Sequence, residues 1–130
     1  MPSVATDTFS VTARPELWRI SDRSTFSALR RRGRRARRGP LTVTWLAPDP
    51  QAAALPPRVG FAIGKAVGGA VVRNRIRRRL RAGFRELQRT DQVPAGAYLV
   101  GATTAGAELP WTDLLTALRE AVHAATEVTP

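Results

Sequence analysis

The chain has 130 residues, 43% of them hydrophobic, which fits one small folded domain and excludes a wholly disordered chain. Its 21 Lys and Arg outnumber its 10 Asp and Glu and give a net charge of +11, which favours a polyanionic partner, with nucleic acid the first to consider. The chain has no cysteine, which excludes disulfides, thiolate nucleophiles and cysteine-based zinc sites.

The first third of the chain predicts an extension followed by a helix. Residues 1–18 are rich in Ser, Thr, Ala and Pro without periodicity, and they are expected to form a flexible N-terminal extension. Residues 19–130 are expected to form a single RNA-binding domain. Ser21 is the expected N-cap of a helix over residues 22–32, which Gly33 ends.

Two strands are predicted next. Apolar residues alternate with threonines over residues 41–45, the pattern of a half-buried strand. RVGFAIGK at residues 58–65 places apolar side chains on one side and small residues on the other, which predicts a second strand. Because the two strands are consecutive in the chain, we expect them to pair as a hairpin.

The second half predicts a helix, a strand and a helix. Apolar residues at helical spacing predict a long helix over residues 70–89, and an apolar run predicts a strand over residues 97–102. Thr112 is the expected cap of a last helix over residues 113–127. The expected fold is α+β, a two-layer α-β sandwich with the order α-β-β-α-β-α.

The long helix carries arginines on one side. At about 100° per residue, Val72, Ile76 and Leu80 fall on one side of the helix and polar residues on the other. Residues 73–85 contain no acid, whereas a solvated helix face usually alternates its charge signs. Guanidinium groups make bidentate contacts with phosphates, so this side predicts nucleic-acid binding. Its residues are Asn74, Arg77, Arg78, Arg81 and Arg85.

A second basic segment, residues 30–38, has seven arginines among its nine residues. It has no apolar face, so we expect a flexible basic arm that contacts RNA; a non-specific anchor or a solubility feature are the alternatives. Together the two segments hold 14 of the 21 basic residues, so the charge is focused. The arm comprises Arg31, Arg32, Arg34, Arg35, Arg37 and Arg38.

No catalytic constellation is visible. GFAIGK at residues 60–65 lacks the spacing and the hydroxyl residue of a phosphate-binding P-loop. His123 is the only histidine and cannot alone build a triad or a metal site. The ten acids are dispersed, which gives little support to a two-metal nuclease site.

These segments resemble the protein subunit of bacterial ribonuclease P over about residues 19–127. The resemblance rests on RISDRSTF at 19–26, on Gly33, on RVGFAIGKAVGGAVVRNRIRRRLR at 58–81, and on the strand and helix that follow. It implies a left-handed β-α-β crossover around the arginine helix. It also implies that a catalytic RNA, which binds most of the Mg²⁺, hydrolyses one phosphodiester bond and releases the 5′ leader of precursor tRNA. The protein itself is then expected to carry no catalytic residue and no metal site.

The resemblance also implies which residues contact RNA. The family's arginine helix faces the catalytic RNA, and the matching positions here are Lys65, Arg73, Asn74, Arg75, Arg77, Arg78 and Arg81. A cleft between the first helix and the sheet contacts the single-stranded leader, with Phe26, Arg30 and Thr44 at the matching positions. Arg30 and Thr44 stand where many members have aromatic residues, and Ala66 where a second lysine often follows. Leader contacts are therefore expected to be more electrostatic than stacked.

The expected partners are the catalytic RNA subunit and precursor tRNA, with no obligate protein partner. Three other classes stay open: a ribosomal-type protein that only binds RNA, a self-contained nuclease, and a sequence-reading DNA-binding protein, for which no helix-turn-helix is visible. No stretch reaches the about 20 apolar residues of a membrane span, and the first residues lack the pattern of a secretory signal. We therefore expect a cytoplasmic protein without membrane contact.

Overall fold

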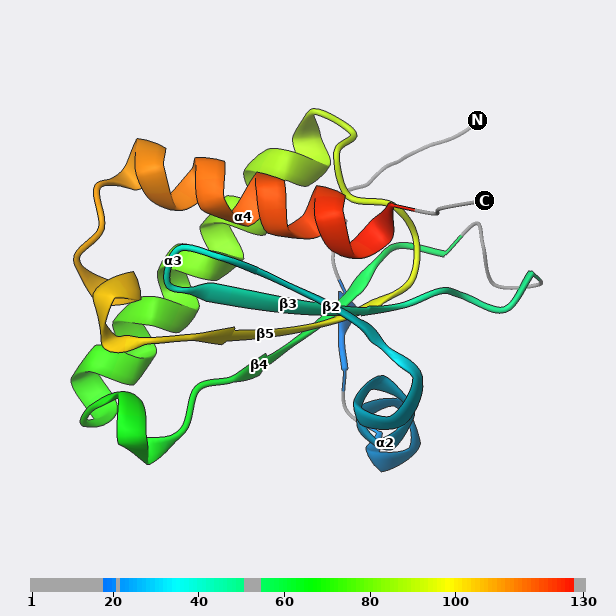
Figure 1. Cartoon of the computed structure of the whole chain (residues 1–130), viewed down its shortest axis with the longest axis horizontal. Coiled ribbons are helices and arrows are strands. Elements are labelled where there is room, and N and C mark those ends of the chain that lie inside the picture. The colour runs from blue at the N-terminus through cyan, green and yellow to red at the C-terminus, as the bar shows by residue number, and fades with distance from the viewer. Residues whose placement is uncertain (1–17, 21, 51–54, 128–130) are drawn as a thin grey trace, which may run out of the picture.

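The computed structural model describes residues 18–20, 22–50 and 55–127, and within them it contains one five-stranded sheet and three α-helices (Figure 1). The strands are β1 (Trp18–Arg19), β2 (Arg34–Arg38), β3 (Leu41–Leu46), β4 (Arg58–Ala62) and β5 (Ala97–Ala102). The α-helices are α2 (Arg23–Arg32), α3 (Ala70–Arg89) and α4 (Trp111–Thr126), and two short 3₁₀ helices are η2 (Lys65–Val67) and η3 (Thr104–Ala107).

The sheet is mixed and has the strand order β1-β4-β5-β3-β2. β5 lies between β3 and β4, antiparallel to β3 and parallel to β4, so the expected hairpin between residues 41–45 and 58–65 is wrong. β3 forms its hairpin with β2 instead, through a turn in which Gly39 has a φ of 55°. β4 and β5 are parallel neighbours joined through α3, which makes the β-α-β crossover; its hand stays a prediction.

The arginine run is ordered, so the expectation of a flexible arm over residues 30–38 is wrong. Arg30–Arg32 form the end of α2, and the five residues from Arg34 to Arg38 form β2. β2 pairs with β3 along its whole length, and Ala36 packs against the main core. Backbone hydrogen bonds rather than buried side chains hold β2 in the sheet. The strand therefore lacks the alternating hydrophobic pattern by which strands are predicted.

The main core lies between one face of the sheet and the two helices α3 and α4. Along α3, Ile76, Leu80 and Phe84 recur at helical spacing and are fully buried. The ring of Tyr98 in β5 lies 5.8 Å from that of Phe84, and its hydroxyl donates a hydrogen bond to the carbonyl of Pro94. Burial raises the pKa of the Tyr98 phenol. The predicted helix over 70–89 and strand over 97–102 are confirmed at both ends.

α2 packs on the opposite face of the sheet, against β3 and β5 (Figure 1, lower right). Leu29 of this helix joins Ile20 and Ala97 in a second, smaller buried cluster. Gly33, directly after α2, lies so close to Thr44 that a Cβ atom there would be 2.5 Å from the threonine methyl carbon. The glycine therefore lets the chain pass tightly from α2 into β2.

The ends of two helices differ from the predictions. The N-cap of α2 is Asp22, whose carboxylate accepts a hydrogen bond from the Thr25 backbone N–H at 2.9 Å; Ser21 lies outside the described residues. α4 begins one residue before Thr112, after Pro110, so Thr112 lies in its first turn. Several polar residues near a helix start are comparable caps, so composition alone does not rank them.

The strand predicted over residues 58–65 is shorter in the structure, and the predicted extension lies almost wholly outside the described residues. β4 ends at Ala62, because the chain turns into η2 at Lys65. Of the predicted extension over residues 1–18, only Trp18 belongs to the described residues, where it pairs with Arg58. No helix in the described ranges is long and apolar enough to cross a membrane.

Candidate nucleic-acid interface

The outward side of α3 carries a row of exposed basic residues. Four of its residues are exposed on the side opposite the buried stripe, and we call them the α3 arginine face: Asn74, Arg78, Arg81 and Arg85. In the described part of the chain, neither Arg78 nor Arg85 makes a side-chain hydrogen bond or an ion pair. Both guanidinium groups are therefore available to a ligand.

Two members of this helix are held by neighbouring groups. Arg77 donates to the side-chain oxygen of Asn74 at 3.0 Å and to the carbonyl of Ile63 at 3.2 Å. The bond to Arg77 fixes the amide of Asn74, whose NH₂ group keeps its donors for an outside partner. The guanidinium carbon of Arg81 lies 5.5 Å from the centroid of the Phe61 ring, a cation–π contact that orients it.

Arg75 and Arg79 lie toward η3, away from the α3 arginine face. Arg75 donates to the carbonyl of Ala107 at 2.8 Å, and Arg79 donates to the carbonyls of Gly106, at 2.8 Å, and Leu109. These contacts fasten the segment between β5 and α4 to α3. The resemblance had placed Arg75 among the RNA contacts, and Arg79 had no assigned role. Their helical angle, about 100° or less from Ile76, is the sequence signal that separates them from the outward residues.

Arg73 and Lys65 lie at the start of α3 and in η2. The Nε of Arg73 donates to the carbonyl of Gly68 at 3.2 Å, which closes the turn that leads into the helix. Lys65 is exposed and begins η2, three residues after the end of β4. The hydroxyl of Thr104 donates to the carbonyl of Val67 and so ties η2 to η3. Lys65 therefore projects from a segment that is fixed to both α3 and η3.

The residues expected in the leader cleft are only partly brought together. Phe26 and Arg30 line a hollow of about 420 Å³ on α2 with Arg23 and Ser27, and we call it the α2 hollow. The Phe26 ring packs on β4. Thr44 does not line this hollow; it is 6% exposed and lies beneath the turn after α2. Its place below that turn removes it from direct contact with a ligand in the hollow.

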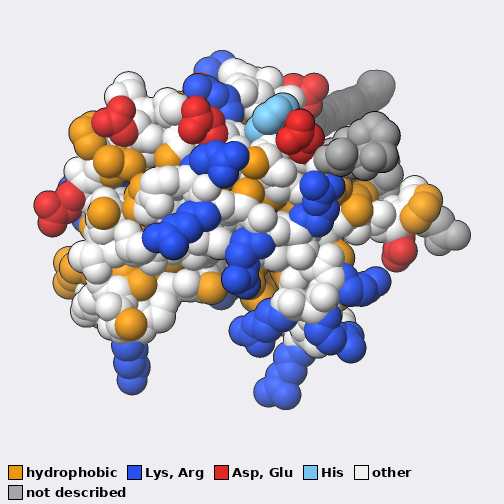
Figure 2. Space-filling model, viewed as in Figure 1, with side chains coloured by type: hydrophobic (Ala, Val, Ile, Leu, Met, Phe, Trp, Pro, Cys, Tyr) orange, Lys and Arg blue, Asp and Glu red, His pale blue; other side chains and the backbone are white. Residues whose placement is uncertain are grey.

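Acidic and basic side chains are unevenly distributed over the face of the molecule that Figure 2 shows. The acidic side chains lie mainly over α4, at the top of the view, whereas Lys and Arg side chains spread over the front edge of the sheet and over α2 (Figure 2). Asp22 contacts Arg58 at 3.2 Å, and hydrogen bonds from Thr25 and Ser24 hold the pKa of its carboxyl well below its usual range. Arg89 lowers the pKa of Glu86 through a charged hydrogen bond.

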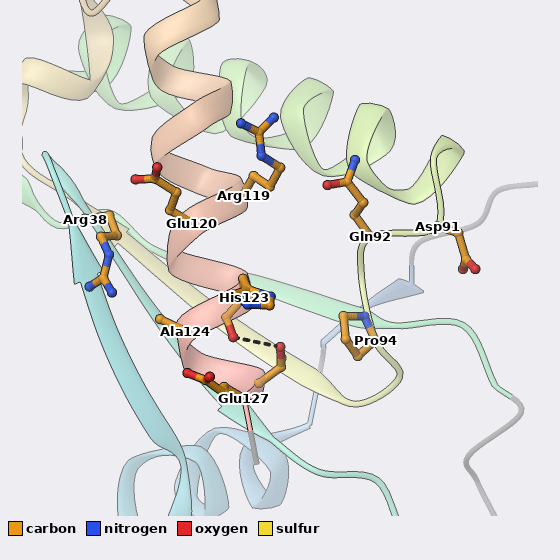
Figure 3. A pocket seen from close by; sticks show the side chains of 10 residues that line it. Arg38, Asp91, Gln92, Pro94, Arg119, Glu120, His123, Ala124 and Glu127 are labelled. Carbon is orange, nitrogen blue, oxygen red and sulfur yellow. Dashed lines mark hydrogen bonds between the residues drawn. The ribbon is translucent and has the colours of Figure 1, made fainter. Parts of the chain in front are cut away.

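A hollow of about 770 Å³ lies between α4, the edge strand β2 and the loop after α3 (Figure 3). It is lined by Arg38, Arg119 and His123 together with three carboxylates, so its charge has no single sign. Its lining residues are Arg38, Asp91, Gln92, Pro94, Arg119, Glu120, His123, Ala124, Thr126 and Glu127. No group of three or more His, Asp or Glu side chains suited to a metal ion occurs in the described ranges.

The architecture defines a small α+β protein in which an arginine-faced helix connects two parallel strands. Residues 15–126 match the family model for ribonuclease P, and the chain is 42% identical over 113 residues to the ribonuclease P protein component of Thermobifida fusca (strain YX), covering 83% of this chain and 76% of that protein. The chain therefore belongs to the ribonuclease P protein family, which gives it a ribonuclease-associated role in tRNA processing and implies an RNA subunit as its partner.

Two solved structures share the fold. The RNase P protein of Staphylococcus aureus matches with a TM-score of 0.69 at 20% identity, over 84% of this chain and 95% of that chain. The RNase P protein of Thermotoga maritima matches with a TM-score of 0.65 at 18% identity, over 82% of this chain and 96% of that chain. The α+β fold predicted from the sequence is thereby confirmed.

Proposed function

We propose that the protein binds the catalytic RNA of ribonuclease P through the α3 arginine face and binds the 5′ leader of precursor tRNA at the α2 hollow. In this proposal the RNA subunit carries the active site and binds most of the Mg²⁺, and the protein takes no part in bond breaking. The protein raises substrate affinity by neutralising phosphate repulsion between the two RNAs. It acts in the cytoplasm, without an obligate protein partner.

The observation that carries the proposal is that the arginines of α3 differ in their contacts. Arg75 and Arg79 donate to backbone carbonyls, whereas Arg78 and Arg85 are exposed and make no side-chain hydrogen bond or ion pair within the described residues. An acid-free row of exposed guanidinium groups suits a phosphate backbone, which takes bidentate contacts from each of them. The exposed side chain of Lys65 extends this charge beyond the start of the helix.

The α2 hollow supports the second half of the proposal. It combines the ring of Phe26 with the guanidinium groups of Arg23 and Arg30. Such a combination holds a single strand by stacking a base and pairing a phosphate. Arg30 supplies a planar, charged group at the position where the family resemblance implies an aromatic residue in many members, which keeps a stacking surface and adds charge.

The test is cleavage of precursor tRNA at low Mg²⁺ by the catalytic RNA alone, by the protein alone and by the mixture. We expect leader removal to be stimulated only in the mixture. Tight RNA binding without stimulation would favour the ribosomal-type class instead. Leader removal by the protein alone would contradict the proposal and favour a self-contained nuclease.

A further inference from the structure

Arg81 differs from the other exposed arginines of the α3 arginine face because an aromatic ring lies against it. Its guanidinium carbon is 5.5 Å from the centroid of the Phe61 ring, within the range of a cation–π contact. Arg81 is exposed and makes no side-chain hydrogen bond or ion pair within the described residues. In the same ranges, Arg78 and Arg85 have no aromatic ring beside them. Phe61 is therefore the group that restrains the direction of Arg81.

The Phe61 ring is held by the sheet and not by the helix that carries Arg81. Side chains alternate along β4, so Phe61 shares the core-facing side with Val59, while Gly60 faces Phe26 of α2. Phe61 is half-buried and packs against the main core. Part of the ring is thus fixed in the core, and the rest reaches the surface beside α3. Because the ring is fixed, it restrains the arginine and does not move with it.

Two successive arginines on this side of α3 are tied to the end of β4, which the chain leaves beside the helix (Figure 1). Arg77, one turn before Arg81, donates to the carbonyl of Ile63 at 3.2 Å. At about 100° per residue, the two arginines are about 40° apart around the helix axis. The hydrogen bond uses an N–H group of Arg77, whereas a contact with a ring face uses none of the five N–H donors of Arg81. Arg81 therefore keeps its whole donor set for a phosphate.

Restraining a side chain before binding lowers the entropic cost of binding. A long side chain that becomes fixed at an interface loses rotamer freedom, and this loss opposes binding. Arg78 and Arg85 lose that freedom when the ligand binds, whereas Arg81 has already lost part of it in the folded protein. A bidentate phosphate contact also needs two N–H groups that point in one direction, which a restrained guanidinium group provides.

The alternative explanation is that Arg81 only shields the ring from water. Arginine stems often cover apolar surface, and such a contact stabilises the fold without affecting RNA binding. The two explanations differ in the effect of Phe61 on the RNA complex. Shielding changes the free energy of unfolding alone. Restraint of Arg81 changes the RNA affinity, and it does so only while Arg81 is present.

We propose that Phe61 is a positioning residue for RNA binding, which touches no RNA itself and raises the affinity for the catalytic RNA by holding Arg81 toward a backbone phosphate. This rests on the proposed function and adds a residue of the sheet to the binding surface on α3. The exposed arginines of the α3 arginine face are then unequal: Arg81 is arranged for its phosphate before RNA arrives, and Arg78 and Arg85 become ordered on binding.

The experiment is a double-mutant cycle on the affinity for the catalytic RNA, made of Phe61→Leu, Arg81→Gln and the two combined. We expect Phe61→Leu to weaken binding about threefold when Arg81 is present and to have no effect in the Arg81→Gln protein. Arg78→Gln is the matched control, because it removes the same charge from the same face without a ring contact; the threefold loss should persist in that background. Phe61→Tyr keeps the ring and should bind RNA like the wild type.

Two further measurements distinguish a positioning role from a lost contact. Arg81→Gln removes a phosphate contact and should reduce the salt slope of binding by about 1, whereas Phe61→Leu leaves the number of contacts unchanged and should keep the wild-type slope. In the free protein, NMR relaxation should show the Nε–H group of Arg81 to be more rigid than those of Arg78 and Arg85. Phe61→Leu should remove this difference.

The same loss of affinity from Phe61→Leu with and without Arg81 would overturn the proposal. Equal mobility of the three guanidinium groups in the wild-type protein would also overturn it, and that measurement does not depend on whether Phe61→Leu folds. If Arg81→Gln weakens binding and Phe61→Leu does not, the positioning role fails and the proposed function stands. Wild-type affinity and salt slope in Arg81→Gln would instead contradict the α3 arginine face, and with it the proposed function.

Discussion

A Cβ atom on Gly60 would lie 2.9 Å from Cε1 of Phe26, so the aromatic ring of α2 rests directly on the backbone of β4. No larger residue fits between them without moving the ring. The position of the α2 hollow above the sheet thus depends on the absence of one side chain.

Gly60→Ala is expected to lower the free energy of unfolding by about 1 to 3 kcal/mol, because the Phe26 ring must shift out of its packed position. Chemical denaturation followed by circular dichroism measures the change. Gly64→Ala is the control: an added Cβ there meets nothing within 4 Å and its φ is −87°, so stability should stay the same or rise slightly. Equal effects at both glycines would contradict the close approach.

Arg79→Ala should destabilise the fold by about 1 to 3 kcal/mol, because the carbonyls of Gly106 and Leu109 lose their donor. Arg78→Ala removes the same charge one residue earlier, from an exposed position, and should leave the unfolding free energy nearly unchanged. Thermal unfolding of both variants checks the difference. Similar losses of stability would mean that the contacts with η3 do not hold it to α3.

The loss of RNA affinity on replacing an exposed arginine should depend on which surface carries that arginine. Arg78→Ala or Arg85→Ala is expected to weaken binding to the catalytic RNA by about 1 to 2 kcal/mol and to reduce the salt slope by about 1, because one phosphate contact is lost. Arg119→Ala removes an exposed charge from α4 and should change neither quantity much. Binding titrations at several salt concentrations measure both, and identical slopes for all three variants would argue against the α3 arginine face.

The free energy of unfolding should fall at acid pH as the Asp22 carboxylate becomes protonated. Hydrogen bonds from Thr25 and Ser24 lower its pKa below the usual 3.8 in the folded protein. A lowered folded pKa stabilises the fold above the unfolded value, and this stabilisation is lost as the pH falls below about 4. Asp22→Asn keeps a capping oxygen but cannot titrate, so this pH-dependent stabilisation should be absent from the variant. The free energies of unfolding of the variant and of the wild type should therefore become similar at low pH. A difference in stability that is independent of pH would contradict this.

Most helices and the central strand were predictable because their burial is periodic. In α3, the spacing of Ile76, Leu80 and Phe84 marks the buried stripe, and the same angles mark Arg78 and Arg85 as outward. The family resemblance added the crossover and the position of Phe26. Phe26 and Arg30 line the α2 hollow together without Thr44, and RNA contacts at all three residues stay predictions.

The features that the sequence did not predict depend on contacts between segments that are far apart in the chain. The arginines of β2 conceal a strand, because β3 supplies its hydrogen bonds. The insertion of β5 between β3 and β4 has no local signal, and consecutive strands favour the wrong hairpin. The roles of Arg75 and Arg79 depend on carbonyls that come some thirty residues later in the chain, at Gly106 and Ala107. No short sequence pattern links these groups.

The central position of β5 also sets an order of events during synthesis. Its two neighbours, β3 and β4, are both made earlier, so before β5 appears only the β2–β3 hairpin and the short β1–β4 pair can form. The sheet closes when β5 enters between strands that are distant from it in sequence, a step that is slow because the long loops must close first. Until then both edges beside the gap are unpaired and open to other chains. A newly made chain is therefore most prone to aggregate just before residues 97–102 are added.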